Sequence, residues 1–320
     1  MIDILKLENE FIGIDIDLGR GADVLSLTHR AKGINVFFST PWRERADEIR
    51  LGLRKPSTSD SSASWLEQYR GGWQTLCPNA GPARKISGSV VGFHGEASIV
   101  PWSLQRSDGQ SAHIRTELFS IPISIDRKLI LDRNVLRTVD VISNLSSVDL
   151  EFDYSSHPAL GGEFLDGRCV IDTGARNVNI DLEDPGSFGS PGSSHGWPWV
   201  TGVDGKRIDM RQLPEAGESK AFFGWLEDFS EPWVSISNLD LGLLVRLDWD
   251  SQYLPYAWVW QELNNSDDFP WFKRARVIAF EPSSTQTSGP NRRSVIRLGA
   301  TQSIEIPISI TLEEFGKGAQ

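Results

Sequence analysis

The sequence predicts an all-β protein, a single large antiparallel domain over residues 1–320. Apolar and polar residues alternate with a period of two along much of the chain, which is typical of half-buried strands. Turn signals recur roughly every ten residues, the spacing expected of a sandwich or barrel. Helical signals are few, and no tandem repeat, charge block or linker separates two domains.

The clearest alternation lies near the two ends of the chain. Ile14, Ile16 and Leu18 alternate with aspartates, and residues 304–312 alternate isoleucine or leucine with mainly polar residues. Both segments are therefore predicted strands with one buried face. Pro307 has no N–H to donate, so we expect the second strand to lie at an edge or to carry a bulge.

Between these ends, residues 129–131 and 135–142 predict a hairpin joined by a three-residue turn at 132–134. Residues 183–218 are rich in Gly, Pro, Ser and charge, and predict long loops over one face. Further strands are predicted over residues 97–105, 112–119, 148–156, 169–173, 177–182, 219–226, 233–237, 241–249, 255–261 and 275–280.

Two short helices are predicted. Residues 41–53 have Thr40 as a candidate cap and a proline in the first turn. Ser64 is the candidate cap of one or two turns over residues 65–70, which the pair Gly71-Gly72 would end.

Charge and composition exclude several classes of protein. The chain has 43 acidic and 32 basic residues, a net charge of -11, which disfavours nucleic acid and anionic membranes as partners. Cys77 and Cys169 form no Cys-x-x-Cys pair, so we expect neither a disulfide framework nor a structural metal site. No apolar run reaches the roughly 18 residues of a membrane span, and four charges within the first eleven residues disfavour a signal peptide. We therefore expect a cytoplasmic protein, either a monomer or a homodimer.

The composition has one unusual feature, twelve tryptophans. Most of them are expected to fill a large β core. The rest are suited to stacking on the apolar faces of sugar rings.

Two histidines stand in unusual contexts. His94 lies between Gly92 and Gly95, whose freedom lets the backbone adopt dihedral angles that an ordinary strand does not need. His157 is predicted to end a strand, because Pro158 forces it into an extended conformation and glycines follow. Each is a candidate functional residue, with a structural histidine as the alternative.

Glu281 is the notable carboxylate. It follows an apolar strand and precedes a proline, so we expect it at a strand end and partly desolvated. Desolvation raises the pKa of a carboxyl and makes it a better base near neutral pH. The alternative is a solvated strand-end glutamate.

Two further segments combine aromatic rings with planar polar groups. Residues 69–82 contain Arg70, Gln74 and Asn79, and residues 256–262 contain Trp258 and Gln261. Amide and guanidinium groups bind hydroxyls and an indole covers a ring face, so these five residues are candidates for sugar binding.

In their order along residues 69–282, these segments resemble the aldose 1-epimerase (galactose mutarotase-like) family. The segments are Gly-Gly-Trp-Gln, Pro-Asn-Ala-Gly, His-Gly-Glu, His-Pro, Trp-Gln-Glu and Glu-Pro. The resemblance implies a β-supersandwich and interconversion of the α and β anomers of a free aldose without a cofactor or metal. It further implies that Glu281 is the catalytic base, that His157 is the catalytic acid and that His94 binds sugar hydroxyls.

The resemblance also has departures, which bear on the choice of sugar. Galactose-type members have an Asn-Arg pair, whereas Ala80 follows Asn79 here, and Asp248 is only a weak match for their substrate-binding aspartate. Arg70 directly before two glycines looks more like the hexose-phosphate branch, where it would bind an anionic group. The alternative is that Arg70 pairs with Glu67 and holds the loop. Neutral, acidic, sulfonated and phosphorylated sugars all stay open at this point.

Two rival functions follow from the same residues. One is a sugar-binding protein that has lost activity, although a pure binder has no need of an acid–base pair. The other is a glycoside hydrolase or lyase, in which Glu96 and Glu281 would flank the scissile bond. For an epimerase, Glu96 is expected to bind or support the substrate.

Overall fold

The computed structural model describes residues 3–215, 217–289 and 291–316. Within them, seventeen of the twenty-three strands form one continuous antiparallel sheet, and the other six form three two-stranded sheets. The large antiparallel sheet confirms the predicted fold class. The strands are β1 (Ile4–Glu8), β2 (Ile12–Asp17), β3 (Asp23–His29), β4 (Ile34–Asn35), β5 (Trp73–Leu76), β6 (Arg84–Ile86), β7 (Ser89–Val91), β8 (Ser103–Ser107), β9 (Ser111–Glu117), β10 (Ile123–Asp132), β11 (Val135–Asn144), β12 (Leu150–Glu151), β13 (Ser155–Gly161), β14 (Cys169–Ile180), β15 (Ser194–Gly196), β16 (Trp199–Thr201), β17 (Arg207–Asp209), β18 (Lys220–Asn238), β19 (Leu243–Trp249), β20 (Tyr256–Leu263), β21 (Arg276–Ser283), β22 (Arg297–Leu298) and β23 (Ser303–Glu314).

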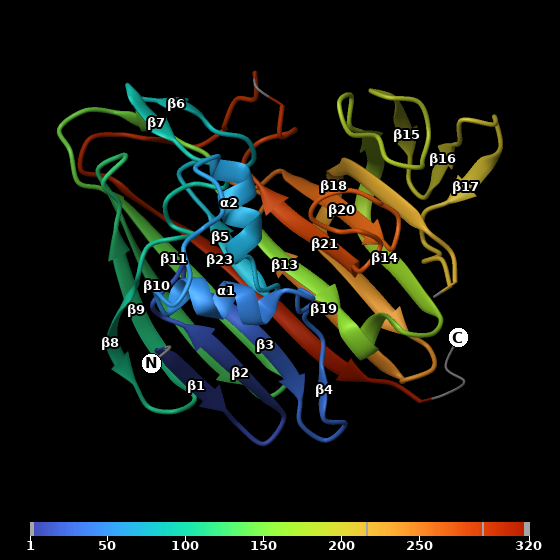
Figure 1. Cartoon of the computed structure of the whole chain (residues 1–320), viewed down its shortest axis with the longest axis horizontal. Helices are drawn as coiled ribbons and strands as arrows, with labels where there is room; N and C mark the ends of the chain where they lie inside the picture. Colours follow the sequence, from blue (N-terminus) through green and yellow to red (C-terminus); the bar gives the residue numbers. More distant parts are fainter. Residues whose placement is uncertain (1–2, 216, 290, 317–320) are drawn as a thin grey trace.

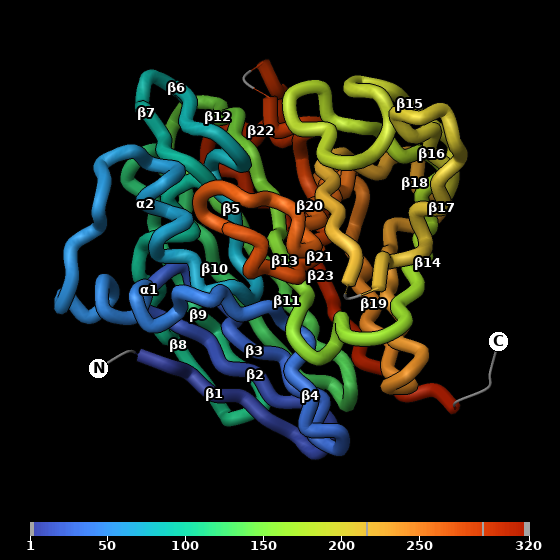
Figure 2. The backbone as a smooth tube through the Cα atoms, turned by 45° about the vertical axis from the view of Figure 1, so that its right-hand side comes forward, coloured from blue at the N-terminus to red at the C-terminus, as the bar shows by residue number. Residues whose placement is uncertain are grey.

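The helices are short and lie outside the sheet. They are α1 (Arg43–Arg50), α2 (Ser61–Gln68) and a 3₁₀ turn at Gly162–Leu165. Figures 1 and 2 show α1 and α2 together on one side of the sheet, away from the small strands β15 to β17. Of the helices in the described ranges, none combines the length and apolar character that a membrane crossing requires.

Five neighbouring strands form the part of the sheet that positions the site, in the order β5, β13, β21, β20 and β18. Their register fixes which side chains meet across the strands. His157 on β13 is opposite Gln74 on β5, and Glu281 on β21 is opposite Trp258 on β20. Side chains two residues apart on a strand share a face, so each strand delivers alternate residues to the same side of the sheet.

The core divides into a large and a small part. The large part packs the apolar faces of the strands, and includes the alternating Ile14, Ile16 and Leu18 of the N-terminal segment. The small part is mainly aromatic and alanine, with Trp65, Tyr69 and Trp258 at its centre. This small part borders the cavity described below.

Several predicted elements differ from the structure in detail. β10 and β11 are longer than predicted and leave a two-residue turn at Arg133-Asn134, because strand pairing continues to Asp132 and Val135. The segment 183–218 is not all loop, since it contains β15, β16 and β17.

The helix caps also differ from prediction. The second helix begins at Ser61, with Asp60 rather than Ser64 as its cap; the Asp60 carboxylate accepts the N–H of Ala63 at 2.8 Å. Thr40 caps no helix, because its hydroxyl donates to the carbonyl of Tyr69.

Candidate active site

A cavity of about 230 Å³ is lined by residues of four of these strands, β13, β18, β20 and β21, together with residues of α2 and of the β20–β21 connection. This volume is below the roughly 300–1,000 Å³ of pockets for drug-sized ligands, so it suits a molecule the size of a monosaccharide. Its lining residues are Trp65, Leu66, Tyr69, Gly81, Pro82, Phe93, His94, His157, Asp184, Phe223, Trp258, Trp260, Trp271, Glu281 and Ser288.

His157 and Glu281 come together at the floor of this cavity from adjacent strands. The His157 Nε2 atom lies 3.5 Å from Glu281 Oε1, and both side chains are buried. His157 Nδ1 and Glu281 Oε2 are also buried, and neither has a hydrogen-bond partner among the described residues. His157 lies near the start of β13, not at a strand end as predicted, because β13 begins at Ser155 and continues through Pro158 to Gly161.

Burial shifts the pKa values of the two groups in opposite directions. It raises the pKa of Glu281 to about 8 and lowers that of His157 to about 4, because a charge is poorly solvated in this apolar site. Between these values the empty cavity therefore holds a protonated carboxyl beside a neutral imidazole. Moving one proton from Glu281 to His157 gives the carboxylate and imidazolium without changing the number of protons on the pair.

His94 is held in one orientation by its own backbone and by Gly81. Its φ of 60° is rare for a residue with a side chain, and the φ of Gly95 is also positive. The His94 N–H donates to the Gly81 carbonyl at 3.0 Å, and the Gly81 N–H donates to His94 Nδ1 at 3.2 Å. This second bond places the ring proton on Nε2, where it can donate to a ligand.

The pKa of His94 is well below its usual value. Burial is the main cause, and the neighbouring His157 and Arg292 add to it. His94 therefore stays neutral at physiological pH and is suited to hydrogen bonding.

Aromatic side chains form most of the wall. Trp260 lies between His157 and Trp271, with ring centroids 5.8 Å and 5.1 Å away. Trp258 is fully buried, and its indole N–H donates to the Thr285 carbonyl at 2.8 Å. Trp258 lines the cavity, and because its N–H is engaged only its ring is left to face a ligand.

Five of the predicted binding residues do not line this cavity. They are Arg70, Gln74, Asn79, Glu96 and Gln261. Arg70 bonds to Asp17 and Asp47, and not to Glu67, which pairs with Arg45 instead.

The other four residues have different contacts and positions. The Gln74 amide donates to the Gly71 carbonyl at 2.7 Å. Both Glu96 oxygens accept backbone N–H groups, from Phe119 and Ser120. Gln261 is buried and follows Trp260 on β20, so it points to the opposite face of the sheet.

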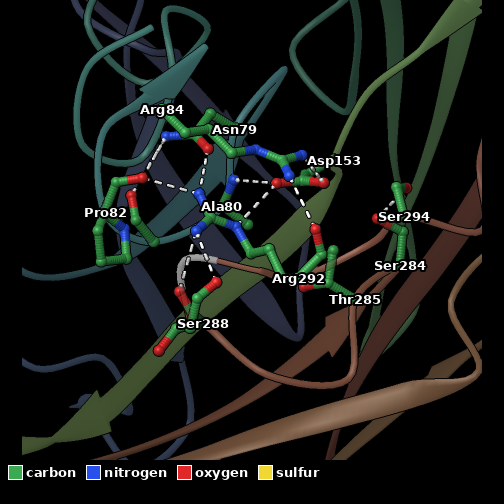
Figure 3. Close-up of polar contacts among 12 residues, drawn as sticks. Asn79, Ala80, Pro82, Arg84, Asp153, Ser284, Thr285, Ser288, Arg292 and Ser294 are labelled. Atoms are coloured by element: carbon green, nitrogen blue, oxygen red, sulfur yellow. Dashed lines mark hydrogen bonds and ion pairs between the residues drawn. The ribbon is translucent and has the colours of Figure 1, made fainter. Parts of the chain in front are cut away.

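Asn79 belongs to a buried polar cluster behind the cavity wall (Figure 3). The Arg292 guanidinium donates to the Asp153 carboxylate, to the side-chain amide oxygen of Asn79, and to the backbone carbonyls of Pro82, Ser288 and Gly289. Pro82 and Ser288 themselves line the cavity. Arg292 therefore joins two wall segments that are about 200 residues apart in sequence.

Asp248, the weak candidate for a substrate-binding aspartate, lies on β19 and pairs with Arg246. It is not among the cavity residues. Asp184 is the second carboxylate that does line the cavity, and its pKa is raised by burial and by the charges of Asp181 and Glu262. Within the described ranges, no group of three His, Cys, Asp or Glu side chains is arranged to hold a metal ion.

Sequence reasoning missed most of the wall: Trp65, Tyr69, Phe223, Trp260, Trp271, Asp184 and Ser288. The period-two spacing of Trp258 and Trp260 was an available signal, because it places both indoles on one face of β20. Trp271 and Asp184 lie in connections between strands, where no period exists to place them.

Comparison with known proteins identifies solved structures that have a similar fold. No family model and no curated protein matches the sequence. Among solved structures, a protein from Synechocystis sp. PCC 6803 aligns with a TM-score of 0.69 at 18% identity, covering 98% of this chain and 97% of that one. A galactose mutarotase related enzyme from Lactobacillus acidophilus aligns with a TM-score of 0.67 at 14% identity, covering 98% of each chain. A homologue of GalM/aldose epimerase from C. elegans aligns with a TM-score of 0.66 at 13% identity, covering 99% and 100%.

These similar structures are mostly aldose 1-epimerase or galactose mutarotase-like proteins. The chain therefore has the galactose mutarotase-like fold, as the sequence motifs predict. At these identities the likeness concerns the fold, and the chemistry has to be argued from the cavity itself.

Proposed function

We propose that this protein is an aldose 1-epimerase that interconverts the α and β anomers of a neutral free aldose. The observation that carries the proposal is the pair of His157 and Glu281, 3.5 Å apart in an aromatic cavity of monosaccharide size. An acid and a base on neighbouring strands are what anomer exchange requires, because one hydroxyl proton must leave while the ring oxygen gains one.

In the proposed reaction, the ionised Glu281 removes the proton from the anomeric O1 hydroxyl and the imidazolium of His157 donates a proton to the ring oxygen. The C1–O5 bond breaks and the open-chain aldehyde forms. Rotation about C1–C2 presents the other face of the carbonyl, and the two proton transfers then run in reverse as the ring closes. When the ring has closed, Glu281 is again ionised and His157 again protonated, so no co-reactant is consumed.

The ionised pair is reached from the neutral one by the single proton transfer described above. The hydroxyls and ring oxygen of a bound sugar offer hydrogen bonds to the charged forms, which the described residues do not supply to His157 Nδ1 and Glu281 Oε2. Binding is therefore expected to favour the imidazolium and carboxylate relative to the empty site.

The neutral character of the substrate follows from the charges around the cavity. None of its lining residues is Arg or Lys, whereas Glu281 and Asp184 are both acidic. A sugar carboxylate, sulfonate or phosphate would enter without a cationic partner, which is costly in an apolar site. The aromatic wall is suited to the C–H faces of an uncharged pyranose.

The rival functions have weaker support. A sugar-binding protein does not require the buried pair, and the glutamates named for a hydrolase are not together, since Glu96 is engaged with backbone N–H groups outside the cavity. Both rivals can be tested in the same assay.

Polarimetry on freshly dissolved aldoses tests the proposal. We expect the protein to accelerate mutarotation of at least one neutral hexose or pentose, and not of uronic acids or sugar phosphates. Binding without acceleration would indicate a sugar-binding protein. Release of aglycone from glycosides, with no effect on free sugars, would indicate a hydrolase.

A further inference from the structure

Tyr69 is a cavity residue whose buried hydroxyl makes no hydrogen bond to the described residues. Its backbone follows the last turn of α2, where its N–H donates to the Leu66 carbonyl. Its ring stacks on Trp65 at 5.0 Å and meets the edge of His157 at 6.0 Å. The ring is thus fixed against the acid–base pair by packing alone.

The Tyr69 hydroxyl is buried and has no hydrogen-bond partner among the described residues. A buried hydroxyl without a partner is disfavoured and is rare in native proteins, where nearly all such groups are bonded. Tyr154 shows the ordinary case in the same chain, because its buried hydroxyl donates to Asp140 at 2.9 Å. The two tyrosines differ in that only Tyr69 lines the cavity.

The surroundings of Tyr69 also fix its protonation state. Burial raises the pKa of the phenol well above its usual value, and the carboxylates of Glu281 and Asp23 raise it further. The group is therefore an O–H donor at every pH at which the protein would work. A donor beside Glu281 and His157, facing a cavity of monosaccharide size, is placed to meet an oxygen of a bound sugar.

We propose that the Tyr69 hydroxyl donates a hydrogen bond to a hydroxyl oxygen of the bound aldose and selects for that hydroxyl. The proposal rests on the proposed function for the class of ligand, but not for the reaction. A site that bonds a substrate hydroxyl rejects the analogue that lacks it, because its own polar group is then left buried and unpaired. One monodeoxy derivative of the substrate should therefore bind the wild type poorly.

The test compares Tyr69→Phe with the matched control Tyr154→Phe. Each variant removes one buried hydroxyl and keeps the ring. The readouts are thermal unfolding, and the Kd of D-glucose, D-galactose and their monodeoxy derivatives, followed by tryptophan fluorescence.

For Tyr69→Phe we expect an unchanged or higher Tm, a Kd for the best-binding aldose about tenfold weaker, and loss of discrimination against one deoxy derivative. For Tyr154→Phe we expect a lower Tm, because the hydrogen bond to Asp140 is lost, and an unchanged Kd.

The outcomes separate this proposal from the proposed function. A lower Tm with unchanged Kd in Tyr69→Phe would make its hydroxyl a structural group and overturn the proposal. Aldose binding that depends on Tyr69, but without any mutarotation by the wild type, would overturn the epimerase and leave the contact standing. No binding of any of these aldoses to the wild type would overturn the proposed contact, and polarimetry on the wider panel of neutral hexoses and pentoses would then decide the proposed function.

Discussion

Two buried polar regions lie side by side in this protein, and they differ in how their polar atoms are used. In the cluster around Arg292, all five guanidinium N–H groups have acceptors, and both Asp153 oxygens have donors. In the cavity, by contrast, His157 Nδ1, Glu281 Oε2 and the Tyr69 hydroxyl are buried and have no hydrogen-bond partner in the part of the chain that the structure describes. In the first region, Arg292 and Asp153 are thus fully bonded by protein groups, and the second region has bonding capacity that a ligand could use.

The difference indicates what each region does. Satisfied buried charges hold segments together, and removing one partner is costly because the other is left unpaired. Unsatisfied groups lower stability and are tolerated where function requires them. Substitution should therefore reduce stability in the Arg292 cluster and activity in the cavity, and the following predictions test that division.

The largest effect is expected for Glu281→Gln. The amide keeps the shape of the side chain but cannot accept the O1 proton, so kcat should fall by about 10²–10⁴-fold in polarimetry. The matched control is Glu96→Gln, which changes a glutamate outside the cavity and should retain most of the activity. Retention of more than about a tenth of the wild-type kcat in Glu281→Gln would show that another group is the base.

The same variant makes a prediction about stability and pH. The pKa of Glu281 is raised from 4.5 to about 8 in the folded protein, so the wild type loses stability as pH rises from about 4.5 to 8. Glu281→Gln has no titrating group at this position, so it does not lose stability in this way as pH rises. Its free energy of unfolding should exceed that of the wild type by an amount that grows over this window, measured by urea unfolding at pH 5 and pH 8.

Arg292→Met should mainly reduce the stability of the protein, whereas Glu281→Gln mainly reduces its activity. It removes five hydrogen bonds and one partner of the buried Asp153, and we expect a loss of roughly 3–5 kcal/mol in the free energy of unfolding. Arg84→Met is the control, since Arg84 is more exposed and makes fewer bonds to the cluster. Equal losses in the two variants would contradict the claim that Arg292 stabilises the cluster more than Arg84 does.

The pH profile of kcat/KM, which reports the pKa values of the free protein, sharpens the assignment of the pair. With ordinary pKa values, Glu281 would set the acid limb and His157 the alkaline limb. Burial reverses the order, so the pair holds the required protons between about pH 4 and pH 8. His157→Asn should lower the whole curve and remove the acid limb. Loss of the alkaline limb instead would mean that the two groups titrate in their usual order.

The smallest effect on function is expected at Arg70. Its guanidinium is engaged with Asp17 and Asp47 away from the cavity, so Arg70→Lys should weaken the fold by about 1–2 kcal/mol. KM values for neutral and anionic sugars should change by the same factor. A selective rise of roughly tenfold in KM for an anionic sugar would return Arg70 to substrate recognition.

The sequence predicted those features that depend on local pattern. The period-two alternation predicted the sheet, and the glycine and proline contexts singled out His94, His157 and Glu281, all of which line the cavity. Trp258 was found through its aromatic neighbours.

The remaining features depend on distant partners, which local pattern does not reveal. From its local sequence, Asn79 resembles a ligand-binding amide. In the structure its amide oxygen accepts a hydrogen bond from Arg292, 213 residues later. Arg70 likewise resembles an anion-binding group, but its guanidinium donates to Asp17, 53 residues earlier. Tyr69 and Trp271 become cavity residues only when α2 and the β20–β21 connection meet over the strands.

The most direct test of the account is anomer exchange measured by NMR. Selective inversion of the α-anomer H1 signal of a neutral aldose should transfer to the β-anomer signal in the presence of the wild-type protein, and Glu281→Gln should abolish the transfer while Glu96→Gln preserves it. Transfer that survives in Glu281→Gln, or its absence with every neutral aldose in the wild type, would contradict the assignment of this cavity as an epimerase site.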